Sequence, residues 1–484
     1  MDILPSVIHR MTRDEVRFFK LFSGRSHDRA DRLDKRLFDL IRQAGEEYDD
    51  DKVFERLYKE GNKNAYYRLK NRLLQDVGKS LTLQHFDDDD TVHALHLLGL
   101  AKFHLGRSNT RAAHYYLRRA ESEAVKLNQY ELLDLIYGDL IRLSHEQVSV
   151  NPEEYIKRRR ENLERIHQVR AIDDLLAAVS YRMRVTQNFG SGKNPVMPLL
   201  EKIVNEYAHD PALLRNPQVR FRLYEAVTRI LLQKRDYPAL EEYLLGTWKE
   251  FNEAKLFNRG NHDAKLQMLV FIVNTLFKNG KSKESLHYAA ILHTAMEEHQ
   301  KFLYGKYLFF HYNALVINYS KLDKDKAIAI LQEMKANERI RSTPFYEMFV
   351  YLNLAVLYFD KAEFGQSIRQ LSRLYLLDAY RDADRSLQFK IAIAELMIRY
   401  ELQDEELLER KLREAKKDFR DLITKRQHPR EVKMLHILQR MLESENLHKD
   451  KVLQKQIQEL LAPTPETEDA EILQYGNWLK SKLG

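Results

Sequence analysis

Residue types that commonly carry chemistry are present in this 484-residue chain, but few of them occur at the spacing that chemistry requires. The nearest approach to a phosphate-binding loop is the sequence GSGK at Gly190–Lys193. A phosphate-binding loop has a glycine five positions before its Gly-Lys pair and a Ser or Thr after the lysine. The chain has Gln187 and Asn194 at those two positions. We therefore interpret the segment as a turn between helices.

Histidines and nucleophile motifs give no stronger signal. The chain has 18 His and no Cys, and its closest grouping of histidines is His93, His96 and His104. Zinc requires three or four ligands that neighbouring groups hold in place, and the sequence around these histidines supplies no such set. No Gly-x-Ser-x-Gly sequence is present either. We predict no metal, no cofactor and no enzymatic activity.

One segment, Lys63–Lys79, is locally basic and contains the adjacent tyrosines Tyr66 and Tyr67. A basic helix that follows several short helices is typical of the DNA recognition helix of a helix-turn-helix-like domain. Apolar residues in the same segment equally suit a helix that packs on its neighbours with a solvated basic face, so both interpretations stay open. In the first interpretation the nucleic-acid contacts are Lys63, Arg68, Lys70 and Arg72.

Composition favours helices over any other element. The chain has only 16 Gly and 11 Pro, about half of the average usage, and this scarcity excludes a hairpin-rich all-β fold. Hydrophobic residues make up 44% of the chain and charged residues 31%, as in an ordinary globular protein. Without cysteine there is no disulfide and no thiolate site. We predict an all-α protein.

Charge and hydropathy indicate a soluble, cytoplasmic protein without a membrane partner. The 79 basic and 72 acidic residues leave a net charge of +7, which is small for this length and is not concentrated as in most nucleic-acid-binding domains. The N-terminus lacks the basic start and apolar core of a signal peptide. The longest apolar stretch, Met268–Phe277, is about half as long as a membrane span.

Residues 1–88 have the pattern of a small domain of short helices. Thr12 and Glu15 form a capping-box sequence ahead of an apolar run. The segment Arg32–Gln43 is amphipathic. The acidic run Asp87–Asp90 then interrupts the pattern and marks the predicted boundary of the domain.

Beyond this boundary, predicted helices recur in pairs. The clearest pair spans Phe349–Tyr375, where Ala355 and Ser367 stand 4 and 16 positions after Tyr351. Small residues at these two positions let the two helices cross closely, while larger residues fill the contact on either side. Further pairs that follow this spacing, some of them loosely, are 95–116, 224–244, 269–292, 312–334 and 391–415.

This spacing resembles the tetratricopeptide repeat, a helix–turn–helix unit of about 34 residues. The resemblance implies an α-α superhelix (a TPR-like solenoid) over residues 91–461, preceded by the helical domain of residues 1–88. Residues 462–484 would then form a proline-and-acid linker and a helix that caps the last repeat. The N-terminal block MTRDEVRFFKLFSG is similar to a group of uncharacterised tetratricopeptide proteins of Bacteroidota, a resemblance that implies no activity.

In proteins of this repeat class, the first helix of each pair lines the concave face. Aromatic and basic residues, which often anchor interfaces, are numerous among the positions projected onto it. Asn274 also matches one Asn of the clamp with which some family members hold a C-terminal carboxylate, but Val270 stands where that clamp has Lys. The projected residues are Arg222, Glu225, Arg229, Asn274, Phe277, Lys278, Tyr312, Tyr319 and Phe359.

We therefore expect a non-enzymatic protein–protein interaction scaffold or adaptor that binds a peptide or a partner helix in the concave groove. The basic and aromatic character of the projected residues suits a partner with acidic character. The alternative is a regulator whose N-terminal domain binds nucleic acid and whose repeats sense a ligand or a partner.

Overall fold

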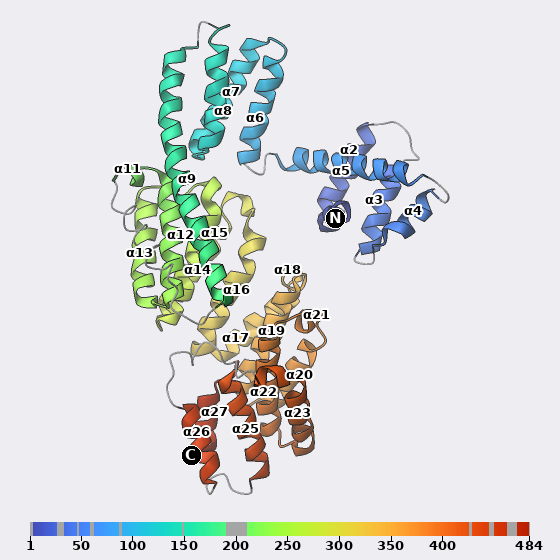
Figure 1. Cartoon of the computed structure of the whole chain (residues 1–484), viewed down its shortest axis with the longest axis vertical. Coiled ribbons are helices and arrows are strands. Elements are labelled where there is room, and N and C mark those ends of the chain that lie inside the picture. The colour runs from blue at the N-terminus through green and yellow to red at the C-terminus, as the bar shows by residue number, and fades with distance from the viewer. Residues whose placement is uncertain are drawn as a thin grey trace. The chain divides into compact units, whose positions relative to one another are not determined.

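The computed structural model describes residues 3–26, 33–45, 48–58, 62–86, 90–147, 150–189, 211–424, 428–444, 450–461 and 472–483. Within these ranges every regular element is a helix, which confirms the predicted all-α class (Figure 1). The GSGK segment and the linker residues 462–471 lie outside the described residues. The chain divides into two compact units: Met1–Lys234 with Glu250–His262, and Arg235–Lys249 with Asp263–Gly484. The sequence did not predict this division.

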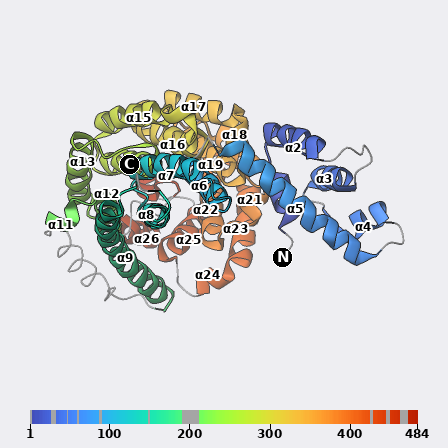
Figure 2. The same cartoon turned by 90° about the horizontal axis from the view of Figure 1, so that it is seen from above.

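The N-terminal helices share a core of their own. Buried apolar residues from all of them, including Ile8, Phe19, Phe38 and Leu73, form one cluster, and Figure 2 shows the long helix α5 running past its shorter neighbours. The helices are α1 (Leu4–Arg10), α2 (Arg13–Ser26), α3 (Leu33–Ala44), α4 (Asp50–Tyr58) and α5 (Lys63–His85).

The predicted capping box at the start of α2 is confirmed. The backbone N–H of Thr12 donates to Glu15 Oε2 at 2.6 Å, and the backbone N–H of Glu15 donates to Thr12 Oγ1 at 3.2 Å. These two bonds satisfy backbone donors that the first turn of a helix leaves without a partner.

The rest of the first unit consists mainly of longer helices, which pack on their neighbours along the chain, with two short ones between them. Asn216, which is 3% exposed, ties three of them together, because its Oδ1 accepts from the Tyr130 hydroxyl at 3.1 Å and its Nδ2 donates to Gln168 Oε1 at 3.2 Å. The helices are α6 (Asp90–Leu105), α7 (Thr110–Lys126), α8 (Tyr130–Leu143), α9 (Pro152–Phe189), α11 (Pro211–Leu214), α12 (Pro217–Lys234) and the 3-10 turn η2 (Arg259–Asn261).

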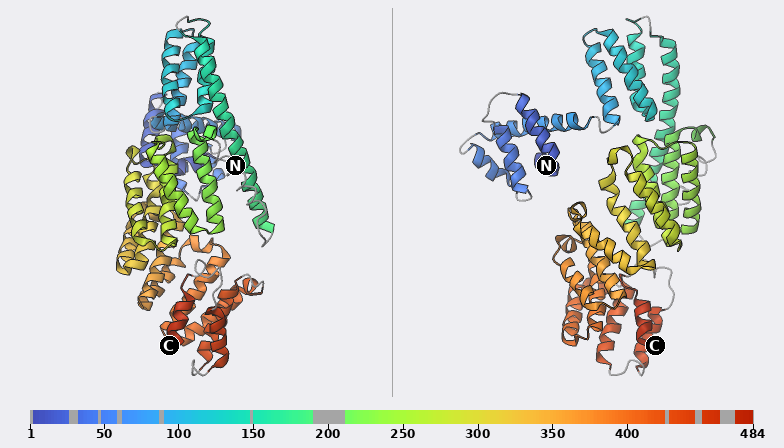
Figure 3. Two further views of the ribbon diagram at one scale, coloured as in Figure 1. Left: turned by 90° about the vertical axis from the view of Figure 1, so that its left-hand side faces the viewer. Right: turned by 180° about the vertical axis from the view of Figure 1, so that it is seen from behind.

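The longest helix of the first unit is α9. It has 38 residues, more than twice the length of α8, and Figure 3 shows it extending past α6–α8. No Gly or Pro occurs between Pro152 and Phe189 to end it earlier.

In the second unit a long helix, a shorter helix and a brief third helix follow one another in a repeated order. The long helices α16, α19 and α22 begin at Tyr304, Pro344 and Arg385, 40 and 41 residues apart. This period is longer than that of the repeat which the sequence resembles, because a brief helix follows each pair. The helices are α14 (His262–Lys278), α15 (Ser282–Met296), η3 (His299–Lys301), α16 (Tyr304–Leu322), α17 (Lys324–Ala336), α18 (Glu338–Arg341), α19 (Pro344–Asp360), α20 (Phe364–Leu374), α21 (Asp378–Arg381), α22 (Arg385–Glu401), α23 (Glu405–Asp418), α24 (Arg420–Thr424), α25 (Pro429–Glu443), α26 (Lys451–Leu461) and α27 (Tyr475–Leu483); α13 (Tyr237–Glu253) contributes to both units.

A buried serine marks the crossing of two of these pairs. The hydroxyl of Ser367 donates to the backbone carbonyl of Ala355 at 2.6 Å, and the hydroxyl of Ser285 donates to that of Val273 at 2.9 Å. Both serines are fully buried. They stand at the small-residue position that the spacing predicts, so the structure confirms the close crossing there. It also shows that a hydrogen bond joins the two helices at each crossing.

The turns within the pairs are short because the backbone enters the left-handed region. Ala362 has φ 59°, and the N–H of Glu363 then donates to the Tyr358 carbonyl at 2.8 Å. At the equivalent turn Gly280 has φ 77°, and the N–H of Lys281 donates to the Leu276 carbonyl at 2.9 Å. Such bonds satisfy the last carbonyls of the first helix, so few Gly and no Pro are needed in these turns.

We expect Ser367→Leu to lower the free energy of unfolding by about 3 kcal/mol, because it forces a larger side chain into a helix crossing and removes a buried hydrogen bond. Urea unfolding followed by circular dichroism, with hydrogen exchange of α19 and α20, measures this loss. Ser372→Leu is the matched control because Ser372 is exposed on the same helix. Equal unfolding midpoints for the two variants would show that a larger side chain fits at the crossing of the two helices.

The C-terminal helix α27 packs on α26 and on the end of α22. Tyr475 and Leu479 are fully buried, and the indole N–H of Trp478 donates to Glu401 Oε1 at 2.5 Å. Lys482 pairs with the same carboxylate at 2.6 Å. In the part of the chain that the structure describes, no helix combines the length and the apolar character needed to cross a bilayer.

Candidate functional site

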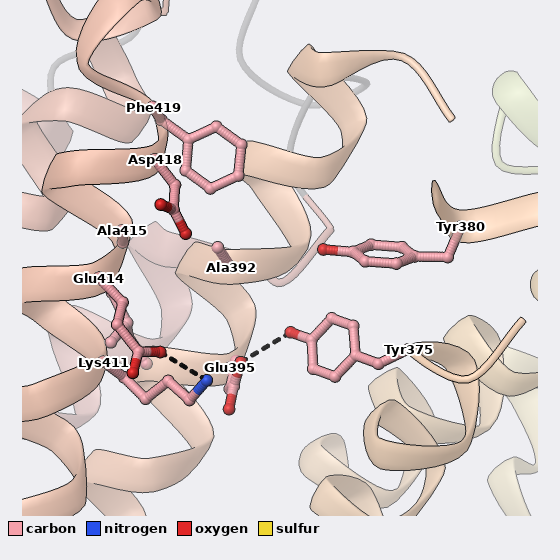
Figure 4. Close-up of a pocket in the computed structure, with 10 residues that line it drawn as sticks. Tyr375, Tyr380, Ala392, Glu395, Lys411, Glu414, Ala415, Asp418 and Phe419 are labelled. Atoms are coloured by element: carbon pink, nitrogen blue, oxygen red, sulfur yellow. Dashed lines mark hydrogen bonds and ion pairs between the residues drawn. The ribbon is translucent and has the colours of Figure 1, made fainter. Parts of the chain in front are cut away.

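The most distinctive site in the second unit is a cavity of about 350 Å³ between α20, α21, α22 and α23 (Figure 4). We call it the tyrosine–carboxylate pocket. Residues from the three consecutive helices α21, α22 and α23, and from the turns that follow α20 and α23, meet there. It is lined by Tyr375, Tyr380, Ala392, Glu395, Leu396, Lys411, Glu414, Ala415, Asp418 and Phe419.

Glu395 forms the inner wall of this pocket. It is 5% exposed, although α22 is otherwise apolar on this face. Its carboxylate accepts from the Tyr375 hydroxyl at 2.7 Å and pairs with Arg399, one turn further along, at 2.6 Å. The charge of Glu395 is therefore neutralised inside the protein. Burial, followed by the nearby Glu395 charge, raises the pKa of Tyr375 well above its ordinary value, so its hydroxyl stays protonated.

The outer wall comes from α23. Lys411 Nζ lies 2.8 Å from Glu414 Oε2, and this hydrogen bond holds the pKa of Glu414 below its ordinary value. Asp418 is exposed, and in Figure 4 its carboxylate points into the pocket. Burial, reinforced by the charges of Glu395 and Asp418, raises the pKa of Tyr380 to about 12. The hydroxyl groups of both tyrosines are therefore neutral at neutral pH.

Aromatic surface completes the pocket. The rings of Tyr375 and Tyr380 meet edge to face, with centroids 4.8 Å apart and planes at 65°. Phe419 closes the opposite side, and its ring already carries the Arg385 guanidinium at 5.3 Å. Aromatic faces beside carboxylates favour cations over anions. The arrangement therefore suits the binding of a cationic group.

None of these lining residues was predicted as a site. The sequence did contain one signal: Glu395 interrupts the apolar run Ile391–Ile398 at a position that faces the core. A charged residue there must find a partner inside the protein. Such a residue marks either an internal ion pair or a site, and the sequence alone does not distinguish the two.

The predicted groove residues of the first unit lie on α12. Arg222 Nε pairs with Asp173 on α9 at 2.6 Å, and Glu225 lies 3.8 Å from the same arginine. Arg229 is exposed. Arg222 is therefore engaged within the unit, and Arg229 is the more accessible of the two predicted cationic contacts.

The predicted groove residues of the second unit divide between surface and core. Tyr312 is buried, and its hydroxyl donates to Glu333 at 2.6 Å. Burial, followed by this hydrogen bond, raises the pKa of Tyr312 to about 12. Phe359 is also buried and packs on Phe364. Their assignment to an open groove is corrected: both stabilise the stacking of helices.

The remaining predicted groove residues of the second unit lie at or near the surface. Asn274 is half-buried and Lys278 exposed, one turn apart on α14. Phe277 supports the ammonium group of Lys321, which lies 4.2 Å from its ring centroid. Tyr319 on α16 is half-buried and accepts a hydrogen bond from Lys326 at 2.7 Å.

The four residues predicted to contact nucleic acid divide into three exposed side chains and one buried side chain. Lys63 is exposed and pairs with Asp51 at 3.1 Å, while Arg68 and Arg72 are exposed on α5. The side chain of Lys70, by contrast, is 8% exposed, and its Nζ lies 2.6 Å from Asp50 Oδ1. Lys70 therefore does not belong to the exposed basic face, and its predicted role as a nucleic-acid contact is corrected.

Asp50 is the centre of a polar cluster in the N-terminal helices. Its Oδ1 accepts from Lys70, from the Tyr66 hydroxyl at 2.8 Å and from the Tyr48 hydroxyl at 2.6 Å. Burial acts to raise the pKa of Asp50, but the hydrogen bonds from these three donors outweigh it and hold the pKa below its ordinary value. The cluster joins α4 to α5 and is structural.

We expect Lys70→Met to lower the stability of the N-terminal helices by about 2 kcal/mol, because it leaves Asp50 without its cation. Hydrogen exchange of α4 and α5 in the full chain measures the loss. Arg72→Met is the control, since Arg72 is exposed on the same helix. Unchanged protection in Lys70→Met would contradict the structural role.

The predicted histidine grouping also packs against aromatic rings. His93 and His96 both lie beside Phe86, with ring centroids 6.2 and 4.8 Å from it. His104 stacks on Tyr116 at 5.5 Å. These contacts account for the positions of the three rings.

Comparison of the chain with protein-family models, with curated proteins and with solved structures finds no match.

Proposed function

We propose that this protein is a non-enzymatic interaction module: an array of TPR-like helix pairs, arranged as a solenoid, that binds a peptide or helix of a partner protein. The observation that carries the proposal is the repeated order of helices in the second unit, with starts 40 and 41 residues apart and the same buried serine contact in two pairs. Arrays of this kind present extended surfaces made by successive units.

The contacts that we propose come from first helices of pairs. Arg229 on α12 and Tyr319 on α16 are the strongest candidates, with Lys278 on α14. Arginine and tyrosine are the residue types that most often anchor interfaces. Since Arg222 already pairs with Asp173, the expected acidic character of the partner rests mainly on Arg229, which is exposed.

A pull-down with the full chain tests this function. We expect a reproducible partner that is lost when Arg229→Ala and Tyr319→Ala are combined, and that is retained by Arg369→Ala on the second helix α20. Recovery of the same partner by the double variant would show that the proposed contacts are wrong. Recovery of no protein under any condition would contradict the proposed function.

The alternative function, binding of nucleic acid by the N-terminal helices, loses one of its four predicted contacts because Lys70 is buried. We expect no salt-sensitive binding of DNA or RNA, and therefore no difference between the wild type and Arg68→Glu/Arg72→Glu in a gel shift at low salt. Binding that rises as salt is lowered and disappears in the double variant would instead favour the regulator.

A further inference from the structure

The tyrosine–carboxylate pocket contains polar groups that the protein itself does not use. Among the described residues, neither the Tyr380 hydroxyl nor the Asp418 carboxylate has a hydrogen-bond or ion-pair partner. In Figure 4 both groups are directed into the pocket from opposite sides. The Asp418 charge also contributes to the raised pKa of Tyr380, after burial and the Glu395 charge, which is consistent with this placement.

One carboxylate that lines the pocket has no ion-pair partner of its own among the described residues. Arg399 neutralises Glu395 at 2.6 Å, and Lys411 neutralises Glu414 at 2.8 Å. Asp418 is the lining carboxylate that remains. A cationic group of a ligand can therefore pair with Asp418.

The walls of the pocket select the shape of that cation. The rings of Tyr375 and Tyr380 line the pocket, and a planar guanidinium stacks on such rings while its N–H groups donate to a carboxylate. An ammonium is a compact and strongly hydrated charge that uses these faces less well. A cavity of about 350 Å³ lies within the range of small-ligand sites.

We propose that the tyrosine–carboxylate pocket binds the side chain of an arginine from a segment of the partner protein. The guanidinium donates hydrogen bonds to the Asp418 carboxylate and stacks on the tyrosine rings. Lys411 stays paired with Glu414 and takes no part in the binding. Free arginine fits less well, because its own carboxylate would face Asp418 and Glu414. This inference rests on the proposed interaction function. It adds a basic anchor to a partner whose acidic part is proposed to face Arg229.

Titration calorimetry of the full chain with three capped pentapeptides tests the proposal. Their sequences are Gly-Ser-Arg-Ser-Gly, the same with citrulline, and the same with lysine. Citrulline has the size and shape of arginine without its charge. We expect the arginine peptide to bind at least about tenfold more tightly than the citrulline peptide, with the lysine peptide between them. Equal heats for arginine and citrulline would overturn the proposal.

Variants assign the binding to the pocket. Asp418→Asn removes the unpaired charge, and we expect it to weaken arginine binding by at least about tenfold. Tyr380→Phe keeps the ring and loses the hydroxyl, and a smaller loss is expected. Asp382→Asn is the matched control, since Asp382 is exposed nearby in the chain and does not line the pocket. Unchanged urea transitions confirm that the variants are folded, and undiminished binding by Asp418→Asn would place the peptide elsewhere and overturn the proposal.

The two proposals fail in different ways. If the partner is recovered in the pull-down but the arginine and citrulline peptides bind equally, only the assignment of the pocket is wrong. If the arginine peptide binds through Asp418 and no protein is recovered, the pocket is confirmed and the interaction function is wrong.

Discussion

Replacing Glu395 by Ala is expected to lower the free energy of unfolding by about 3–5 kcal/mol, one of the two largest effects that the structure implies. The change leaves the Arg399 guanidinium, whose side chain is 13% exposed, without its carboxylate. It also removes the acceptor of the Tyr375 hydroxyl. Urea unfolding, together with hydrogen exchange of α22 and α20, measures the loss.

Two further variants separate the causes. Glu395→Gln keeps the acceptor for Tyr375 but removes the charge, so we expect a smaller loss than for Ala. Glu395→Met/Arg399→Met replaces the buried pair by apolar side chains of similar size and is expected to recover most of the stability. A double variant as unstable as Glu395→Ala would show that the loss comes from packing and not from an unpaired buried charge.

The second large effect concerns His311 on α16 and the pH. Burial, followed by the neighbouring His293, lowers the pKa of His311 to about 4. The two ring centroids lie 4.8 Å apart. A hydrogen bond with the Ala289 backbone and the charge of Glu333 act in the opposite direction but do not outweigh the lowering. The unfolded chain, with a histidine pKa of about 6.5, therefore binds the proton more tightly than the folded chain does.

This difference in pKa sets the direction in which stability changes with pH. The contribution of neutral His311 to stability is fully present above pH 6.5 and is lost as the pH falls from about 6.5 to about 4, by about 3 kcal/mol in total. We expect urea midpoints measured across this window to fall, and His311→Gln to flatten that part of the profile. His287→Gln is the control because His287 is exposed. An unchanged profile in His311→Gln would contradict the buried, neutral state.

Much of the fold could be predicted because its causes are local. The capping box of Thr12 and Glu15 and the small residues Ala355 and Ser367 act within one turn or one helix pair, so their spacing in the sequence fixes their contacts. The brief helices α18, α21 and α24 could not be predicted, because four or five residues are too few for a periodic pattern.

The candidate site could be predicted only in part, because it depends on contacts between distant residues. Lys70 looks like its exposed neighbours Arg68 and Arg72 in the sequence, but its partner Asp50 is 20 residues away. Tyr312 fits the groove position by spacing, yet Glu333, 21 residues later, engages it in the core. Projection onto a helix face distinguishes sides of a helix but not whether a neighbouring helix covers that side.

The central claim is that the first helices of the pairs bind a protein partner, and site-specific photo-cross-linking tests it most directly. A photo-reactive amino acid placed at Tyr319 on α16, or at Arg229 on α12, is expected to capture the same protein from cell extract. The same amino acid at Arg369 on the second helix α20 is expected not to capture it. Absence of a cross-linked protein at both first-helix positions, or equal capture at Arg369, would contradict the account.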